Sequence, residues 1–311
     1  MKKWILLLFV LIFLSVVAIY VIIPSNLQIS DAVTLGCSPA SAARGLLQEF
    51  NWPKWLNSGG ERIISTNDRR EIFTYAINTR LNKELQVEIT KGNQKWPSRL
   101  YIVPEVGDSI SVKWQCTIES GINPFLRWKQ YKDAVALHED MHHVLGRLKS
   151  VLENEQNIYG FSILQTRVTD TVLIATRASF KGFPSTSEIY KLIHDLRKYI
   201  NTQGAKETGF PMIHHDRIDS LRTETMVAIP VNKRLPEKGK FMSKRMVPGY
   251  ILVAEVKGGQ AKVSKAFDEM ENYISDYQKQ KIAISFESYV TSREATDSSS
   301  WITKVYFPIV K

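Results

Sequence analysis

The chain has 311 residues, of which 44% are hydrophobic and 23% are charged, a composition typical of globular domains and not of disordered or fibrous proteins. At about 100–200 residues per domain, this length predicts two domains with additional segments. The formal net charge is +10, from 41 Lys and Arg against 31 Asp and Glu. Because the basic residues form neither a run nor a zinc-finger spacing, we expect a solvated basic surface and no nucleic-acid partner.

Residues 1–26 are predicted to form an N-terminal transmembrane anchor. Residues 4–23 carry no charge, and about 20 apolar residues in a helix span a hydrocarbon core of roughly 30 Å. Lys2 and Lys3 precede this run, whereas residues 24–43 contain no Lys or Arg. The positive-inside bias therefore predicts a single-pass membrane protein with a cytoplasmic N-terminus and its soluble domains outside. A cleaved signal peptide is the alternative.

Two features bear on metal or redox chemistry. The stretch "HEDMHH" at residues 138–143 contains the HExxH spacing of zinc proteases at 138–142. Leu145 and Leu148 stand where the longer zinc pattern needs glycine and histidine, so we interpret the motif as a solvated helix face that is not catalytic. We expect neither a metal nor a cofactor. The same helix is predicted to bury an apolar stripe made of Leu137, Met141, Val144, Leu145, Leu148 and Leu152.

The chain contains only two cysteines, Cys37 and Cys116. The segment "ISVKWQCTIE" alternates between apolar and polar residues, as a half-buried strand does. Cys116 shares the apolar side with Trp114 and Ile118, which predicts a buried free thiol in preference to a disulfide.

Residues 27–155 resemble the START-like, polyketide-cyclase-type (SRPBCC) superfamily. The likeness is carried by "CSPASAARGLLQEFNWPKWLN" and by "GRLKSVLE" near the end of the predicted long helix. In the first stretch the matching positions are Ser38, Pro39, Leu46, Leu47, Trp52 and Trp55. The resemblance implies a helix-grip fold, in which an antiparallel sheet wraps one long helix and leaves an apolar cavity between them.

The remainder of the chain contains a degenerate repeat. "VLIATRASF", a helix, "FPMIHH" and "ETMVAIPV" are followed by "YILVAEV", a helix, "IAISFESYV" and "WITKVYFPIV". Each half is predicted to be strand–helix–strand–strand. Ser185 and Glu188 make a capping box at the start of the first helix.

Residues 158–311 resemble the GyrI-like, or AraC-type effector-binding, domain in "ETMVAIPV", "VPGYILVAEVKGG", "SFESYVTS" and "VYFPIV". The whole chain is thus predicted to be α+β, with a transmembrane helix, a helix-grip domain and a duplicated GyrI-like domain. The last domain is expected to carry helices on one face and a groove on the other.

The alternation of the last strands predicts which side chains line that groove. Ile282, Ile284 and Phe286 share one side, which we assign to the helices, and Glu287 and Tyr289 share the other. Strand parity and the repeat add further groove residues, namely Tyr306, Glu224, Met226 and Ile213.

The GyrI-like resemblance implies that Glu287 faces lipophilic, often cationic, ligands, which aromatic rings also attract. We therefore predict a membrane-anchored, non-enzymatic binder of lipophilic cations that contacts the membrane through residues 4–23. One alternative is a hydrolase that acts on a small electrophile, with Glu287 as general base and Tyr289 or Tyr306 as proton donor. Another is a protein-interaction module. The sequence makes no prediction of the oligomeric state.

Overall fold

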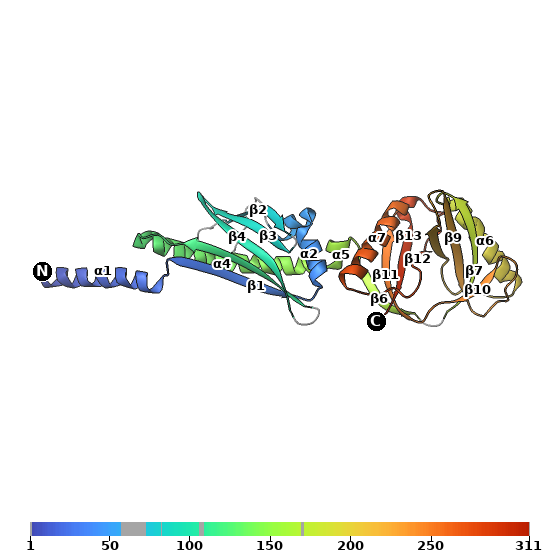
Figure 1. Ribbon diagram of the computed structural model, residues 1–311, viewed down its shortest axis with the longest axis horizontal. Helices are drawn as coiled ribbons and strands as arrows, with labels where there is room; N and C mark the ends of the chain where they lie inside the picture. Colours follow the sequence, from blue (N-terminus) through green and yellow to red (C-terminus); the bar gives the residue numbers. More distant parts are fainter. Residues whose placement is uncertain (1, 57–72, 82, 106–108, 169–170, 311) are drawn as a thin grey trace. The chain divides into compact units, whose positions relative to one another are not determined.

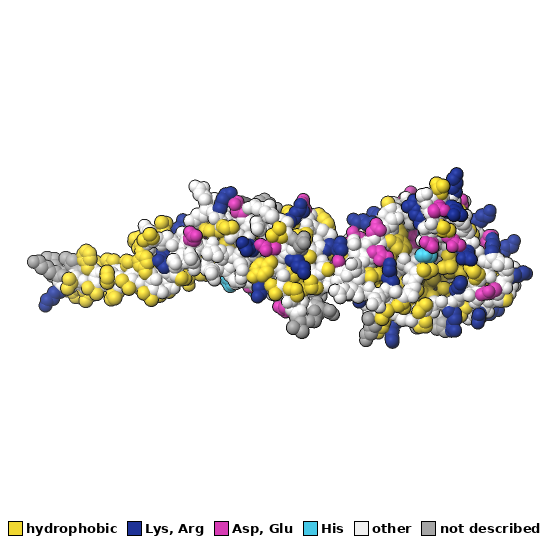
Figure 2. Space-filling model, in the orientation of Figure 1, with side chains coloured by type: hydrophobic (Ala, Val, Ile, Leu, Met, Phe, Trp, Pro, Cys, Tyr) yellow, Lys and Arg dark blue, Asp and Glu magenta, His cyan; other side chains and the backbone are white. Residues whose placement is uncertain are grey.

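The computed structural model describes residues 2–56, 73–81, 83–105, 109–168 and 171–310. The chain divides into two compact units, Met1–Ile158 and Tyr159–Lys311 (Figure 1). Each unit combines helices with an antiparallel sheet, so the predicted α+β class is confirmed. Figure 2 shows Lys and Arg side chains scattered among acidic ones on the face in view.

The N-terminal unit is built on a five-stranded antiparallel sheet with the order β1-β5-β4-β3-β2. Its strands are β1 (Asn26–Leu35), β2 (Thr74–Leu81), β3 (Glu84–Lys91), β4 (Gln94–Pro104) and β5 (Ile110–Glu119). Side chains alternate between a buried and a more exposed face, as the pleat requires. Cys116 lies on the buried face as predicted, and both cysteines are buried and free.

The buried face of this sheet is covered by the long helix α4 (Pro124–Leu152), which Asn123 caps. The predicted apolar stripe of α4 is confirmed, since all six of its residues are buried. His138, His142 and His143 are exposed, and the Nδ1 atom of His142 lies 3.0 Å from a carboxylate oxygen of Asp31. Shorter helices are α2 (Pro39–Leu47), α3 (Trp52–Trp55) and α5 (Glu155–Tyr159).

Polar groups lie between α4 and the sheet, where an apolar cavity was expected. Asp133 and Asp140 of α4 are buried. Asp133 accepts a hydrogen bond from the ammonium group of Lys91 at 2.6 Å, and Asp140 accepts one from the hydroxyl of Tyr75. A hollow of about 800 Å³ lies against the sheet, and it is lined largely by polar residues that alternate with the buried ones.

The predicted membrane anchor is wrong. Residues 4–23 do lie almost wholly in a helix, α1 (Lys2–Ile22), and apolar side chains cover it (Figure 2). A membrane span must be both long enough and apolar enough to cross the hydrocarbon core, and no helix in the described part of the chain meets that requirement. The single-pass localisation and the membrane partner are corrected with it.

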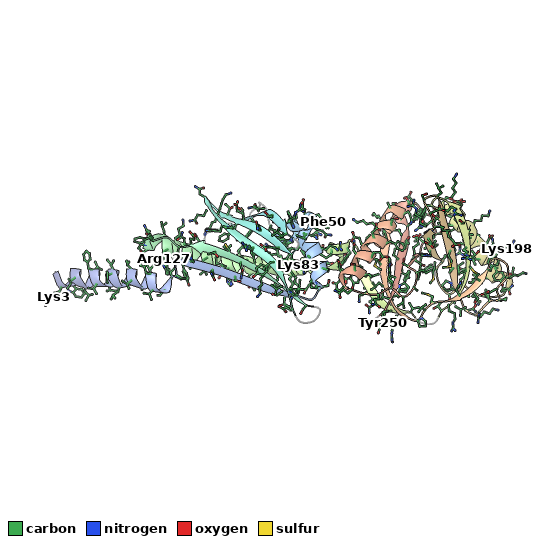
Figure 3. The ribbon with its side chains drawn as sticks, viewed as in Figure 1. Lys3, Phe50, Lys83, Arg127, Lys198 and Tyr250 are labelled. Atoms are coloured by element: carbon green, nitrogen blue, oxygen red, sulfur yellow. The ribbon has the colours of Figure 1, made fainter. Side chains whose placement is uncertain are left out.

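The end of α1 is joined to the start of α4. Arg127, labelled in Figure 3, donates from Nε to the carbonyl oxygen of Ile23 at 2.8 Å. Its guanidinium lies 4.9 Å from the ring centroid of Tyr20. The Tyr20 hydroxyl in turn donates to the carbonyl oxygen of Ile122.

The C-terminal unit contains an eight-stranded antiparallel sheet with the order β10-β7-β9-β8-β12-β13-β11-β6. The predicted duplication is present, because β7-α6-β8-β9 is followed by β11-α7-β12-β13. The first set is β7 (Val172–Lys181), α6 (Thr186–Thr202), β8 (Met212–Arg217) and β9 (Arg222–Val231). The second set is β11 (Gly249–Lys257), α7 (Gln260–Asp276), β12 (Phe286–Tyr289) and β13 (Ile302–Ile309). The edges are β10 (Met242–Arg245) and β6 (Ile163–Val168).

Each helix packs on the strands of its own half, α6 on β7 and β9 and α7 on β11 and β13 (Figure 1). The predicted capping box of α6 is confirmed, with Ser185 and Glu188 bonded reciprocally. The apolar side of α6, including Ile189 and Ile193, packs against Ile213 and Val227 of the sheet. We call this side of the sheet the helix face and the opposite side the open face.

Candidate ligand-binding site

The two halves of the C-terminal sheet meet where β12 pairs with β8. Glu287 lies directly opposite Ile213, and Ser288 opposite Met212. Because side chains alternate along a strand, Glu287 and Tyr289 share one face and Phe286 takes the other. Tyr289 belongs to the cluster around α6, which places Glu287 on the helix face.

The predicted orientation of this strand is therefore reversed. We expected the apolar residues before Glu287 to meet the helices, but Ile282 and Ile284 precede β12 and are exposed, at 38% and 49%. Phe286, which follows them, contributes to a pocket on the open face. Apolar residues on one side of a strand predict that this side is shielded from water. They do not show whether a helix packs there or whether the side chains form the wall of a pocket.

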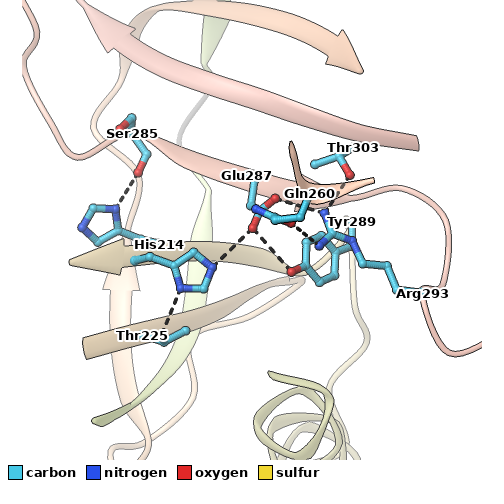
Figure 4. Close-up of polar contacts among 9 residues, drawn as sticks. His214, Thr225, Gln260, Ser285, Glu287, Tyr289, Arg293 and Thr303 are labelled. Atoms are coloured by element: carbon cyan, nitrogen blue, oxygen red, sulfur yellow. Dashed lines mark hydrogen bonds and ion pairs between the residues drawn. The ribbon is translucent and has the colours of Figure 1, made fainter. Parts of the chain in front are cut away.

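Glu287 is 1% exposed and is held by groups from several elements (Figure 4). Its Oε2 atom accepts from the Nη2 atom of Arg293 at 3.1 Å. Its Oε1 atom accepts from the hydroxyl of Tyr289 at 3.4 Å. The Nε2 atom of His215 lies 3.3 Å from the same oxygen, but without the alignment of a hydrogen bond. We call these four residues the Glu287 cluster.

Arg293 is the cation of the cluster and comes from the loop of residues 290–301. Its guanidinium also donates to Gln260 at 2.7 Å and to Thr303 at 2.9 Å (Figure 4). The guanidinium carbon lies 3.5 Å from the ring centroid of Tyr289 and 4.7 Å from that of Trp301. Arg293 thus lies between aromatic rings with a carboxylate at its end, the arrangement expected for a bound organic cation.

The other members of the cluster are also fixed in place. The Nδ1 atom of His215 lies 2.9 Å from the hydroxyl oxygen of Thr225, and the ring of His215 lies 4.5 Å from that of Phe183. Burial raises the pKa of Tyr289, and the nearby charge of Glu287 raises it further. The Tyr289 hydroxyl therefore remains protonated and acts as a donor.

This geometry limits the chemistry of Glu287. A general base must reach the proton that it removes, whereas the Glu287 carboxylate is enclosed by side chains of its own chain. Arg293 and His215 were not predicted. Arg293 lies in the loop between β12 and β13, and no spacing in the sequence links it to Glu287.

A pocket of about 270 Å³ lies on the open face. It is lined by Leu173, Met212, His214, Met226, Ala228, Lys244, Arg245, Met246, Val247, Ala283, Ile284, Phe286 and Pro308. Ten of these thirteen residues are apolar, and three are methionines. We call it the methionine pocket.

The six predicted groove residues divide between the two faces. Glu287, Tyr289 and Ile213 lie together on the helix face, and Met226 lines the methionine pocket. Tyr306 stacks on Phe286 of the pocket wall, with ring centroids 4.8 Å apart, and burial raises its pKa. Glu224 does not line the pocket, and its Oε1 atom lies 3.6 Å from the Nη1 atom of Arg177.

Searches against protein-family models and against curated proteins found no match. Among solved structures, the chain is similar to the EcmrR C-terminal domain, with 17% identity and a TM-score of 0.43 over 49% of this chain and 98% of that one. It is similar to SAV2435 bound to tetraphenylphosphonium, with 16% identity and a TM-score of 0.31 over 48% and 93%. A hydrolase from Listeria innocua has 9% identity and a TM-score of 0.37 over 48% and 91%. None of these likenesses assigns a ligand or an activity to this chain.

Proposed function

We propose that this protein binds a small lipophilic molecule in the methionine pocket of its C-terminal unit. The observation that carries the proposal is a pocket of about 270 Å³ with ten apolar residues among thirteen. Ligand sites combine mainly apolar walls with a few polar groups, and this volume is just below their usual range of roughly 300–1,000 Å³. The GyrI-like resemblance of residues 158–311 implies the same class of function.

The methionines suit such a site. Met212, Met226 and Met246 contribute flexible, polarisable side chains to the wall, and methionine adapts readily to ligands of different shape. Phe286 supplies a flat aromatic surface that Tyr306 supports from behind. The pocket is therefore suited to small lipophilic molecules as a class.

The cation preference expected from Glu287 is not part of this proposal. That preference needs a carboxylate open to the ligand, and Glu287 is 1% exposed with Arg293 at 3.1 Å. A buried carboxylate with an internal cation has no net charge to offer. The binding energy is instead assigned to contact with the apolar wall.

Thermal unfolding of the full chain with a panel of small neutral lipophiles tests the proposal. A ligand at a hundred times its Kd stabilises the folded state by about 2.7 kcal/mol, which raises Tm by roughly 5–10 °C in a domain of this size. Met226→Glu places a charge in the apolar wall and removes the rise. Met242→Glu, at a half-buried methionine on the neighbouring sheet edge outside the pocket, retains it.

Two results would overturn the proposal. One is the absence of a rise with every compound of the panel. The other is an equal rise in the wild-type chain and in Met226→Glu, since the ligand would then bind elsewhere.

A further inference from the structure

We propose that the ligand of the methionine pocket carries an anionic head group, a step that rests on the proposed function. The polar lining of the pocket is entirely basic or imidazole, from His214, Lys244 and Arg245, and none of the thirteen lining residues is acidic. A lipophilic anion places its tail on the apolar wall and its charge beside these groups. A cationic ligand was expected beside Glu287 from the sequence, so the ligand proposed here has the opposite charge.

The ladder between β10 and β7 shows which basic residue faces the ligand. Lys244 lies directly opposite Leu173, whose side chain lines the pocket, and paired residues point to the same face. Arg245 lies opposite Val172, which packs against the cluster on the helix face. Lys244 is therefore the main cation on the pocket side of β10.

The charges around the pocket leave Lys244 as the cation available to a ligand. Lys244 is exposed and has no ion-pair partner among the described residues. Two acidic side chains on nearby strands have basic partners, since a carboxylate oxygen of Glu224 lies 3.6 Å from a guanidinium nitrogen of Arg177 and one of Glu255 lies 3.7 Å from the ammonium of Lys304. Two others lie near the pocket without an ion pair described in the structure, namely Asp216 on β8 and Glu237, which accepts from the N–H of Ser243. Neither Asp216 nor Glu237 lines the pocket, so the charged side chains among its described lining residues are all positive.

His214 adds a fixed polar group inside the pocket. Its Nδ1 atom lies 2.7 Å from the carbonyl oxygen of Ser285 (Figure 4). A carbonyl oxygen only accepts, so Nδ1 carries a proton, and Nε2 of the neutral ring is then an acceptor that cannot donate to an anionic head group. The head group of an anionic ligand is therefore assigned to Lys244 and not to His214.

Three amphiphiles with the same tail separate head-group charge from apolar contact, namely octanoate, octan-1-ol and octylammonium. In calorimetric titration of the full chain, octanoate is expected to bind about twofold to fivefold more tightly than octan-1-ol, the range of an exposed charge pair. Octylammonium is expected to bind more weakly than octan-1-ol. Added salt should weaken only octanoate towards the alcohol, because exposed charges are screened.

Two variants assign the effect to Lys244. Lys244→Gln is expected to make octanoate and octan-1-ol bind equally, and an exposed lysine can be replaced without affecting the fold. Lys198→Gln makes the same change of charge on the exposed side of α6 (Figure 3) and should keep the preference. Repeating the comparison with 2-naphthoate and 2-naphthol shows whether the preference for a carboxylate over an alcohol also holds for a flat aromatic tail.

The outcomes distinguish this inference from the proposed function. If the alcohols bind as tightly as the carboxylates, or the ammonium compound binds best, the anionic ligand is refuted and the lipophilic pocket stands. If Lys244→Gln keeps the preference for carboxylates, the site of the charge is elsewhere and the inference fails. If no compound of either tail binds, the proposed function fails as well.

Discussion

The two halves of the C-terminal sheet follow the same order of elements but bury different chemistry at the place where they meet. In the first half, Ile213 of β8 is fully buried in the apolar cluster around α6. In the second half, the residue directly opposite is Glu287, which is as deeply buried and carries a charge. Equivalent places in the sheet thus accept either an aliphatic side chain or a carboxylate.

The difference lies in the loops. Residues 218–221 connect β8 to β9, whereas the longer stretch of residues 290–301 connects β12 to β13. The longer loop contributes Arg293, whose side chain is 3% exposed and reaches Glu287. A buried charge is tolerated only when it is paired and hydrogen-bonded. The comparison indicates that the long loop and the buried glutamate depend on each other.

The largest expected effect comes from breaking that dependence with Arg293→Ala. The substitution leaves Glu287 buried without its cation, and removing one partner of a buried pair destabilises a protein by about 3–5 kcal/mol. Urea unfolding, followed by hydrogen exchange of the backbone amides of the C-terminal unit, measures the loss of unfolding free energy in this unit alone.

A double variant makes the test specific. Glu287→Leu with Arg293→Met replaces both charges by apolar groups and should cost less than Arg293→Ala, as buried pairs allow. Arg197→Ala, which breaks the 3.0 Å contact with Glu207 on a half-exposed surface, should cost less than about 1 kcal/mol. If the double variant were the least stable of the three, the pair would not be the reason for the loss.

Tyr190→Phe is expected to have the next largest effect, because Tyr190 links the first half to the loop of the second. Its hydroxyl accepts from the backbone N–H of Arg293 at 2.6 Å and donates to Ser292 at 3.4 Å. The variant leaves a buried N–H without a partner, which costs about 1–3 kcal/mol. Tyr250→Phe is the control, since the hydroxyl of this β11 tyrosine has no hydrogen bond described in the structure. An equal loss in both variants would contradict the linking role.

The sequence predicted much of this fold because local patterns determine it. The alternation around Cys116, the apolar stripe of α4 and the Ser185 capping box each concern residues close together in the chain, and each is present. The repeat was found because both halves use the same order of strand and helix signals. The uncharged run at the N-terminus predicted a helix correctly, whereas the predicted membrane span was wrong.

The candidate site was less predictable because it depends on contacts between distant residues. Glu287 meets His215 from another strand and Arg293 from a loop, and strand parity contains no information about a loop. Strand alternation correctly placed Phe286 and Glu287 on opposite faces of the sheet. It wrongly assigned the face of Phe286 to the helices and the face of Glu287 to the groove. Met226 was selected through the repeat and does line the methionine pocket, whereas Lys244 lies outside the repeat on an edge strand.

A smaller effect is expected where the halves differ in helix capping. Ser185→Ala removes the side chain that accepts from the N–H of Glu188 at the start of α6. Loss of such a cap costs about 0.5–2 kcal/mol, and the same hydrogen-exchange measurement detects it. Ser243→Ala, on β10 and outside any cap, should change the stability by less than about 0.5 kcal/mol. A loss below that level at Ser185 would show that the cap contributes little.

The smallest expected effect is a gain, from Gly259→Ser at the start of α7. Gly259 occupies the capping position without a side-chain bond, and its φ of −72° and ψ of 176° suit any residue. An added Cβ would lie 3.8 Å from the Cβ of Ser298, an ordinary contact. Serine is a better cap than glycine by a few tenths of a kcal/mol, or roughly 0.3 kcal/mol. Gly239→Ser, at a φ of +60°, should instead destabilise by roughly 1–2 kcal/mol. If Gly259→Ser lowered the stability instead, the start of α7 would not tolerate a new cap. The neighbouring Gln260 bonds to Arg293, so the position of the first turn of α7 would then be set by the Glu287 cluster and not by helix capping.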